Sequence, residues 1–279
     1  MKRGLWVNIA LLIAVVALLL FAWLKPDQRE PDFKLSTLTA ADATSIRIEI
    51  AGAAPIVLER PASGWQITAP LAARADNFQV QRLLGILEAK SKDRFPATGL
   101  ARFELNEPYA RVTINQQVFS FGAANPISRE QYLLTRDGIY MIDLRHGATL
   151  PGNVLQLVSK QLFAPEEAPV AFEFKEFSLA QQDGRWRLTP PAADLSQDDI
   201  NRWVDEWRLA TALAVQPPSD SKPLATVKVR LKSGDDITLS LLQREPHWVL
   251  ARSDQKFEYQ LPGAIAQRLL APPAADNAK

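Results

Sequence analysis

The side chains best suited to acid–base or nucleophilic chemistry in this sequence are its two histidines, His146 and His247. A histidine site of that kind needs a carboxylate or a serine that the fold brings beside the imidazole. Neither histidine belongs to an HxxxH motif or a similar ligand spacing, so no metal site is predicted. His146 lies in an expected loop and His247 begins an expected strand. We therefore interpret both as solvated or capping residues.

Three pairs of adjacent carboxylates are the next candidates: Glu166-Glu167, Asp198-Asp199 and Asp235-Asp236. A glycosidase needs two such groups that face each other across a cleft. These pairs lie instead in an expected linker, at a helix start and in a hairpin turn, where solvation and the helix dipole explain them. The sequence therefore favours a protein that is not an enzyme. A hydrolase is the alternative, and it would require two acids that converge in a pocket.

The tryptophans are the last candidates for a ligand site. Trp203 and Trp207 fall on the apolar face of an expected helix, and Trp248 lies in an alternating strand. Core packing is the simpler interpretation of such indoles. The alternative is an exposed platform for sugar rings or a partner peptide, and we retain Trp248, Trp203 and Trp207 as the possible ligand or partner surface.

Composition excludes several classes of function. The chain has no cysteine, which rules out disulfides, thiol nucleophiles, iron–sulfur clusters and the acylated cysteine of a lipoprotein. Its formal net charge is +1, so nothing indicates a nucleic-acid partner. The 12 glycines occur singly, so no phosphate-binding loop is present. No cofactor is predicted.

An apolar stretch near the N-terminus predicts a membrane anchor. Leu5 to Leu24 is 20 residues long, carries no charge and has one polar side chain, Asn8. A helix of that length spans the ~30 Å hydrocarbon core of a bilayer. Lys2 and Arg3 precede it, so we expect the stretch to start on the cytoplasmic side of a bacterial inner membrane and the rest of the chain to lie in the periplasm. No small-x-small site follows, which favours an uncleaved, single-pass anchor over a signal peptide. The expected anchor residues are Leu5, Trp6, Leu20, Trp23 and Leu24.

The rest of the chain repeats one order of elements twice. Pro151-Gly152 closes the first copy and Pro262-Gly263 the second; each copy has strands leading to a tryptophan, a proline, a capped helix and then alternating strands. We predict an α+β fold with an N-terminal transmembrane helix and two tandem similar modules, each an antiparallel sheet packed on one main amphipathic helix. The predicted parts are an anchor (1–25), a linker (26–44), a first module (45–163), a second module (170–272) and a disordered tail (273–279). Each copy is expected to end in a helical piece, Asn153 to Leu162 in the first and Ala264 to Leu270 in the second.

The main helices agree in register. Asp76 with Gln79 resembles a capping box, and Ser196 with Asp199 repeats it 120 positions later. The apolar faces keep the same offset, with Val80, Leu83, Leu84 and Leu87 matched by Ile200, Trp203, Val204 and Trp207. Lys90, Lys92 and Arg94 follow the first helix; contact with anionic headgroups is one explanation, but cations at a helix C-terminus suffice.

The first copy resembles a bacterial family known as domain of unknown function 4340. The residues that carry the resemblance are Leu58-Glu59-Arg60, Gly64-Trp65-Gln66-Ile67, Pro70, Ala75-Asp76 and the run from Val80 to Leu87. It is strongest over residues 46–142 and weaker over 172–261. The resemblance implies a membrane-anchored envelope protein, in some members encoded beside ABC exporters of the gliding-motility type. It implies no catalytic residue.

The anchor, the two β-rich modules and the lack of reactive groups together favour an accessory subunit of an envelope or transport complex. Its expected partners are the lipid bilayer, through the N-terminal helix, and another envelope protein, which exposed strand edges would bind by strand addition. The alternative is a module that binds cell-wall glycans through exposed aromatics.

Overall fold

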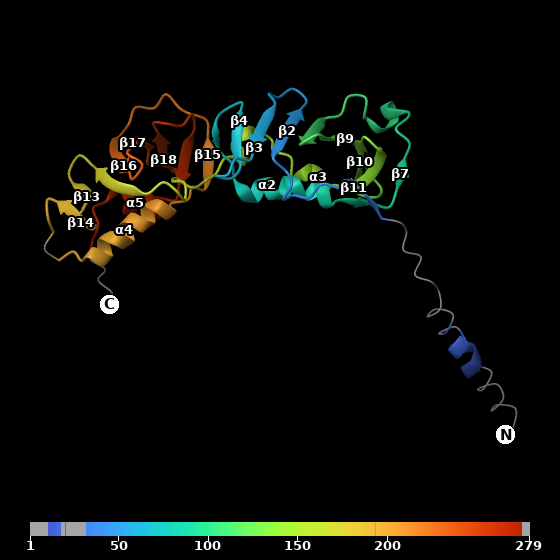
Figure 1. Ribbon diagram of the computed structural model, residues 1–279, viewed down its shortest axis with the longest axis horizontal. Helices are drawn as coiled ribbons and strands as arrows, with labels where there is room; N and C mark the ends of the chain where they lie inside the picture. The colour runs from blue at the N-terminus through green and yellow to red at the C-terminus, as the bar shows by residue number, and fades with distance from the viewer. Residues whose placement is uncertain (1–10, 18–19, 21–31, 193, 275–279) are drawn as a thin grey trace, which may run out of the picture.

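The computed structural model describes residues 11–17, 20, 32–192 and 194–274. Two antiparallel sheets lie side by side along the long axis of the body, with the main helices on one side (Figure 1). The predicted α+β class is therefore confirmed. Leu5, Trp6, Trp23 and Leu24 of the expected anchor lie outside the described residues, whereas Leu20 is described and exposed. In the part of the chain described here, no helix combines the length and the apolar character needed to cross a bilayer.

The first sheet has nine strands in the order β5-β4-β3-β2-β8-β9-β10-β11-β7. Its strands alternate between buried and exposed residues, as in β2, where Ile46 and Ile48 are buried and Arg47 is exposed. The bounds are β2 (Ser45–Ile50), β3 (Ile56–Glu59), β4 (Gln66–Ala69), β5 (Ala73–Arg74), β7 (Arg94–Phe95), β8 (Ala110–Ile114), β9 (Gln117–Asn125), β10 (Glu130–Thr135) and β11 (Gly138–Asp143).

The second sheet has eight strands in the order β14-β13-β12-β16-β17-β18-β19-β15. Read from β14 to β19, this order matches the run from β4 to β11 in the first sheet, strand for strand. The bounds are β12 (Pro169–Glu173), β13 (Ser178–Gln182), β14 (Arg185–Thr189), β15 (Ala214–Gln216), β16 (Ala225–Leu231), β17 (Asp236–Gln243), β18 (Trp248–Arg252) and β19 (Glu258–Leu261).

The two main helices begin alike and end differently. Asp76 caps α2 (Asn77–Leu84) by accepting from the N–H groups of Phe78 and Gln79, and Ser196 and Asp199 form a complete capping box on α4 (Gln197–Leu209). α2 gives way at Gly85 to the 3₁₀ turn η1 (Gly85–Glu88), whereas α4 continues without a break. Glycine is a poor helix former, which explains the earlier end. Among the described residues, the other helical elements are a short stretch at 11–17, α3 (Arg145–Ala148), α5 (Gly263–Leu270) and the 3₁₀ turns η2 (Leu100–Phe103) and η3 (Val154–Leu157).

Part of the expected linker belongs to the body of the protein. β1 (Phe33–Lys34) pairs antiparallel with β6 (Lys90–Ser91), and Leu35 and Ala43 are buried. The prediction of a free spacer over 26–44 is therefore wrong for its C-terminal half, because these apolar side chains cover the edge of the core. The expected C-terminal tail is described only at 273–274.

Residues 157–162 join the two sheets. The helical piece expected over Asn153 to Leu162 is confirmed for η3 and wrong beyond Leu157. Only η3 is helical; beyond it, Ser159 N–H donates to Arg74 O at 2.8 Å and Asp76 N–H donates to Leu157 O at 2.7 Å. On the other side, Leu162 N–H donates to Ala210 O at 2.9 Å and Ala212 N–H to Lys160 O at 2.8 Å. We call residues 157–162 the bridging segment. It pairs with the residues beside β5 and those before β15, so it occupies the edges at which the two sheets meet.

The outer edges are also protected. Trp186, on the edge strand β14, donates its N–H to Gln197 Oε1 at 3.0 Å, and its C=O accepts from Gln197 Nε2 at 2.8 Å. By strand alternation the next groups that point outward belong to Leu188, and Pro190 after it has no N–H. At the other end, β7 is only two residues long. Strand addition therefore has little free backbone to use among the described strands.

Both sheets contribute to one large apolar core, and a second small cluster of Phe103, Leu105 and Ile139 covers the outer face of the first sheet. Gly122 on β9 makes that cluster possible. A Cβ at Gly122 would overlap the carbonyl oxygen of Phe103, so only glycine permits this close approach.

Candidate functional site

The residues considered for catalysis do not assemble. His146, at the start of α3, is buried rather than solvated, and burial lowers the pKa of its imidazole, as does the neighbouring Arg145. His247 is exposed in the loop before β18. The described residues contain no cluster of three or more histidines and carboxylates that could hold a metal ion.

The carboxylate pairs have structural partners. Asp199 belongs to the cap of α4, and Asp236 pairs with Arg230 across the hairpin at 2.8 Å. Glu167 is the exception to the expected solvation, because both of its oxygens accept from the guanidinium of Arg252, at 2.8 and 2.9 Å. Burial by itself raises the pKa of Glu167, but the hydrogen bonds from Arg252 and Ala164 outweigh it, and the pKa lies below its ordinary value. A structural contact thus accounts for one acid of each pair: Asp199, Asp236 and Glu167.

Two of the three tryptophans proposed for a ligand surface lie in the core. Trp203 is 6% exposed and Trp207 is fully buried, and both pack against Phe172, with ring centroids 5.1 and 5.5 Å away. Trp203 Nε1 donates to the carbonyls of Arg268 and Ala271 at the end of α5. The interpretation as an exposed platform is therefore wrong for both residues, since the gap between α4 and the sheet is filled by their rings. This removes the basis for glycan binding by these aromatics.

Trp248 is half-buried at the start of β18. Its ring packs against the core, and the guanidinium carbon of Arg244 lies 5.5 Å from the ring centroid. A cation so placed covers an indole face. One partly covered ring does not make a stacking platform.

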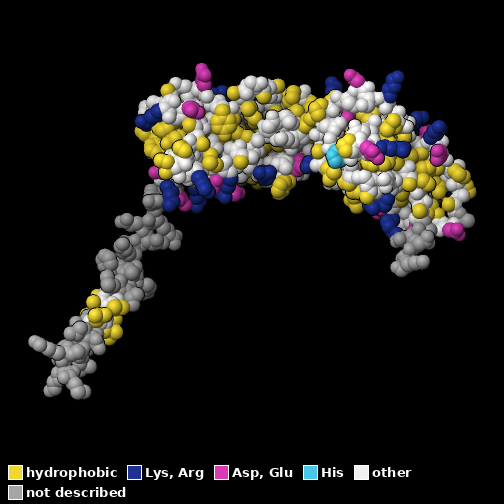
Figure 2. Space-filling model, turned by 180° about the vertical axis from the view of Figure 1, so that it is seen from behind, with side chains coloured by type: hydrophobic (Ala, Val, Ile, Leu, Met, Phe, Trp, Pro, Cys, Tyr) yellow, Lys and Arg dark blue, Asp and Glu magenta, His cyan; other side chains and the backbone are white. Residues whose placement is uncertain are grey.

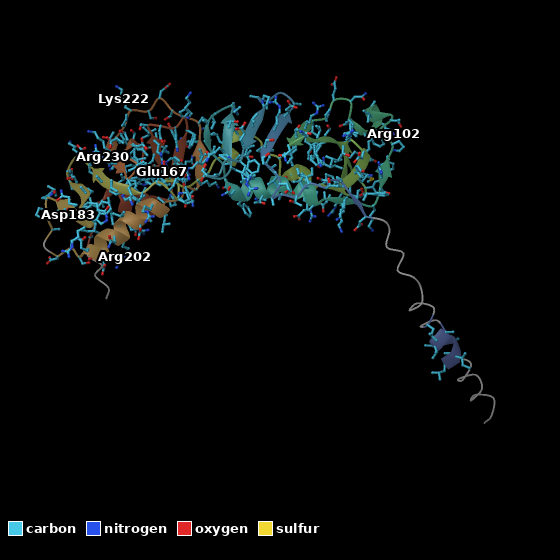
Figure 3. All side chains as sticks on the ribbon, in the orientation of Figure 1. Arg102, Glu167, Asp183, Arg202, Lys222 and Arg230 are labelled. Atoms are coloured by element: carbon cyan, nitrogen blue, oxygen red, sulfur yellow. The ribbon has the colours of Figure 1, made fainter. Side chains whose placement is uncertain are left out.

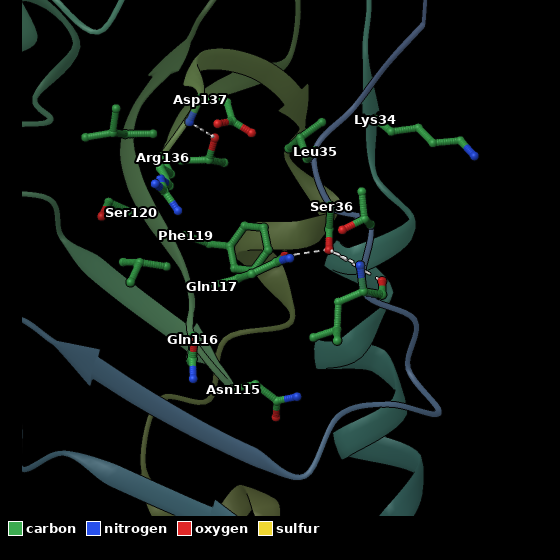
Figure 4. A pocket seen from close by; sticks show the side chains of 15 residues that line it. Lys34, Leu35, Ser36, Asn115, Gln116, Gln117, Phe119, Ser120, Arg136 and Asp137 are labelled. Carbon is green, nitrogen blue, oxygen red and sulfur yellow. Dashed lines mark hydrogen bonds between the residues drawn. The ribbon is translucent and has the colours of Figure 1, made fainter.

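A groove of about 1040 Å³ lies in the first sheet, and we call it the strap groove. It lies where residues 34–38 cross the β8–β9 and β10–β11 turns (Figure 4). Segments about 80 residues apart in the sequence thus meet in it, as the hydrogen bond from Ser36 to Gln117 illustrates. The lining residues are Lys34, Leu35, Ser36, Thr37, Leu38, Asn115, Gln116, Gln117, Val118, Phe119, Ser120, Leu134, Thr135, Arg136 and Asp137.

The strap groove suits binding rather than catalysis. Ser36 Oγ donates to Gln117 Oε1 at 2.5 Å and accepts from Leu38 N–H at 2.9 Å, so the serine is held by an amide and no base activates it. Val118 is 41% exposed, and the side chains of Gln116 and Arg136 are exposed. Apolar surface beside free amide and guanidinium donors can receive an extended peptide, whose backbone needs both donors and acceptors.

Asn115 fixes the wall of the groove. Its backbone is left-handed, with φ 52°, and its Oδ1 accepts from Thr44 N–H at 2.9 Å and from Ser45 N–H at 3.1 Å. Its Nδ2 donates to Asp42 O at 3.0 Å. One side chain therefore ties the chain entering β2 to the β8–β9 turn.

We expect Asn115→Ala to lower the free energy of unfolding by about 2 kcal/mol, because alanine loses these bonds and is strained in the left-handed region. Urea unfolding followed by tryptophan fluorescence measures the loss. Asn115→Gly keeps the backbone conformation and loses the bonds, so it should cost less; an equal cost would show that the backbone strain contributes nothing.

No sequence pattern predicted the strap groove or the role of Arg252. The groove has no motif because its walls come from three separated segments. Arg252 resembled an ordinary cation at the end of a strand, although its side chain is only 1% exposed in the structure.

The chain matches one family model, described as a domain of unknown function (DUF4340), over residues 65–228. The match runs from the end of the first sheet's β3–β4 turn, across the bridging segment, into β16. No curated protein matches the chain. No solved structure matches it either.

Proposed function

We propose a function for this chain on the following basis. The chain belongs to the family described as domain of unknown function (DUF4340), because the family model matches residues 65–228, more than half of the chain. The protein is a single-pass, membrane-anchored periplasmic protein without enzymatic activity. It is an accessory subunit of an envelope or transport complex, for example one built around an ABC transporter, and it binds an extended segment of another envelope protein in the strap groove.

The strap groove carries this proposal. It combines an exposed apolar residue, Val118, with free polar side chains such as Gln116 and Arg136, and its wall is held in place by Asn115. The blocked outer edges favour a groove over strand addition.

Two further parts of the proposal rest on the sequence. The stretch Leu5 to Leu24 supports the anchor, and Lys2 and Arg3 support the periplasmic orientation. The common strand order and the matched helix starts support an origin of the two modules by internal duplication.

Site-specific photo-crosslinking in intact cells tests the binding site. A photoreactive residue at Val118 is expected to capture one partner in high yield, whereas the same residue at Ile127, just beyond the other end of β9 and 92% exposed, should not. Val118→Arg should weaken retention of that partner about tenfold or more, because a charge then blocks the apolar part of the groove. Ile127→Arg is the matched control. Equal capture at both positions, or no capture at either, would contradict a specific groove.

A further inference from the structure

The structure places an exposed basic surface at the point where the described body begins. Lys34 on β1 lies opposite Lys90 on the paired strand β6, and Lys92 follows it; all three side chains are exposed. The Lys34 side chain extends away from the strap groove (Figure 4). Figure 2 shows several lysine and arginine side chains along the lower edge of this half of the molecule, with acidic side chains among them.

These lysines do not serve a helix terminus. α2 ends at Leu84, η1 ends at Glu88, and Ala89 is already extended, so Lys90 lies in a strand rather than in a last helical turn. The explanation through the helix dipole is therefore wrong for them. Over residues 32–34 and 82–94, basic residues outnumber acidic ones five to three, and one of the acids, Asp32, pairs with Lys90 at 3.3 Å.

Covalent geometry keeps this surface near the proposed anchor. Phe33 on β1 comes nine positions after Leu24, the end of the apolar stretch, so the two lie at most about 32 Å apart. A cationic surface on so short a tether is held within reach of the headgroups. Each lysine near an anionic bilayer strengthens the attraction about fivefold, and this effect falls off within a Debye length.

We propose that the surface formed by Lys34, Lys90 and Lys92 docks on anionic phospholipid of the leaflet from which the body emerges. This proposal rests on the membrane anchor of the proposed function. Docking fixes the first sheet, and with it the strap groove, at the membrane surface.

The experiment uses the full chain in nanodiscs of phosphatidylcholine alone or mixed equally with phosphatidylglycerol. Because the chain has no cysteine, Glu88→Cys creates a single labelling site two residues before Lys90, and spin-labelled headgroups quench a dye attached there. Lys222→Cys, on the side of the second sheet opposite the helices (Figure 3), is the reference position. Quenching at position 88 should rise in the anionic discs and stay low at position 222.

Removing the charges should reverse the effect. Lys34→Gln, Lys90→Gln and Lys92→Gln together are expected to lower the ratio of docked to undocked molecules about a hundredfold. The matched control carries Lys222→Gln, Lys232→Gln and Lys256→Gln on the second module, read with the dye at position 88. Equal quenching at position 88 in both lipids, or an equal effect of the two triple variants, would overturn docking alone. Release of the unmodified chain from membranes by alkaline carbonate would overturn the anchor and, with it, the docking.

Discussion

Replacing Arg252 by methionine is expected to lower the free energy of unfolding by about 3 kcal/mol, because it leaves the carboxylate of Glu167, whose side chain is only 22% exposed, without its counter-charge. The guanidinium binds both oxygens of Glu167, both oxygens of Asp254 and the carbonyl of Leu162. Burial lowers the pKa of Arg252, but the hydrogen bonds that it donates to the two carboxylates raise the pKa above its ordinary value, so the group stays charged. Its loss also frees the end of the bridging segment.

Arg230→Met is the matched control for this variant. Arg230 makes the same two-point contact with a carboxylate, that of Asp236, but both side chains are 61% exposed. Ion pairs on the surface contribute little to stability, so the free energy of unfolding measured in urea should barely change in Arg230→Met. A loss for Arg252→Met no larger than that for Arg230→Met would contradict the role of burial.

The ion cluster of Arg252, Glu167 and Asp254 also predicts how the stability of the fold decreases at acid pH. Burial raises the pKa of both Glu167 and Asp254, yet the hydrogen bonds from Arg252 outweigh it and leave both pKa values lowered. A carboxylate with a lowered pKa stabilises the fold above its unfolded pKa and ceases to do so as the pH falls through its folded pKa. Stability should therefore fall below about pH 4.5 in the unmodified protein, and less so in Arg252→Met.

The second large effect is expected for Trp207→Ala, at about 3–5 kcal/mol, because a fully buried indole is lost and the space cannot collapse. Trp207 packs between α4 and the second sheet, with ring centroids 5.5 Å from Phe172 and 6.0 Å from Trp203. Urea unfolding followed by far-ultraviolet circular dichroism measures the loss without relying on the missing indole.

Trp207→Phe separates packing from hydrogen bonding. The Nε1 of Trp207 is buried and makes no hydrogen bond, so phenylalanine removes no satisfied polar group and should cost less than half as much as alanine. Leu87→Ala probes the corresponding position of the first module, on η1, and should fall in the usual range for leucine, about 2–5 kcal/mol. Similar losses for Trp207→Phe and Trp207→Ala would mean that the indole nitrogen, not the ring volume, matters.

Local patterns in the sequence predicted the regular elements well. The alternation of Ile46, Arg47 and Ile48 defines β2, and Ser196 with Asp199 defines the start of α4, because both signals depend only on near neighbours. Strands of two residues, such as β1 and β6, have no period to detect. Their existence depends on partners more than 50 residues away.

The errors have the same origin. The spacing of Leu155, Val158 and Leu162 resembles a helix, but the backbone beyond Leu157 finds better hydrogen-bond partners at Arg74 and Ala210. Gly85 ended α2 earlier than the apolar face suggested. The strap groove could not be predicted, since it is created by the meeting of three segments rather than by any one of them.

The bridging segment has a consequence for how the chain can be divided. Cleavage anywhere between residues 157 and 162 would leave one or both fragments with a sheet edge whose backbone amide and carbonyl groups lack hydrogen-bond partners. Separately produced halves should therefore aggregate or reassociate. A chain truncated after the first sheet should likewise be prone to aggregation. Each half thus protects the other against aggregation, so unfolding of one half in the cell should expose the other.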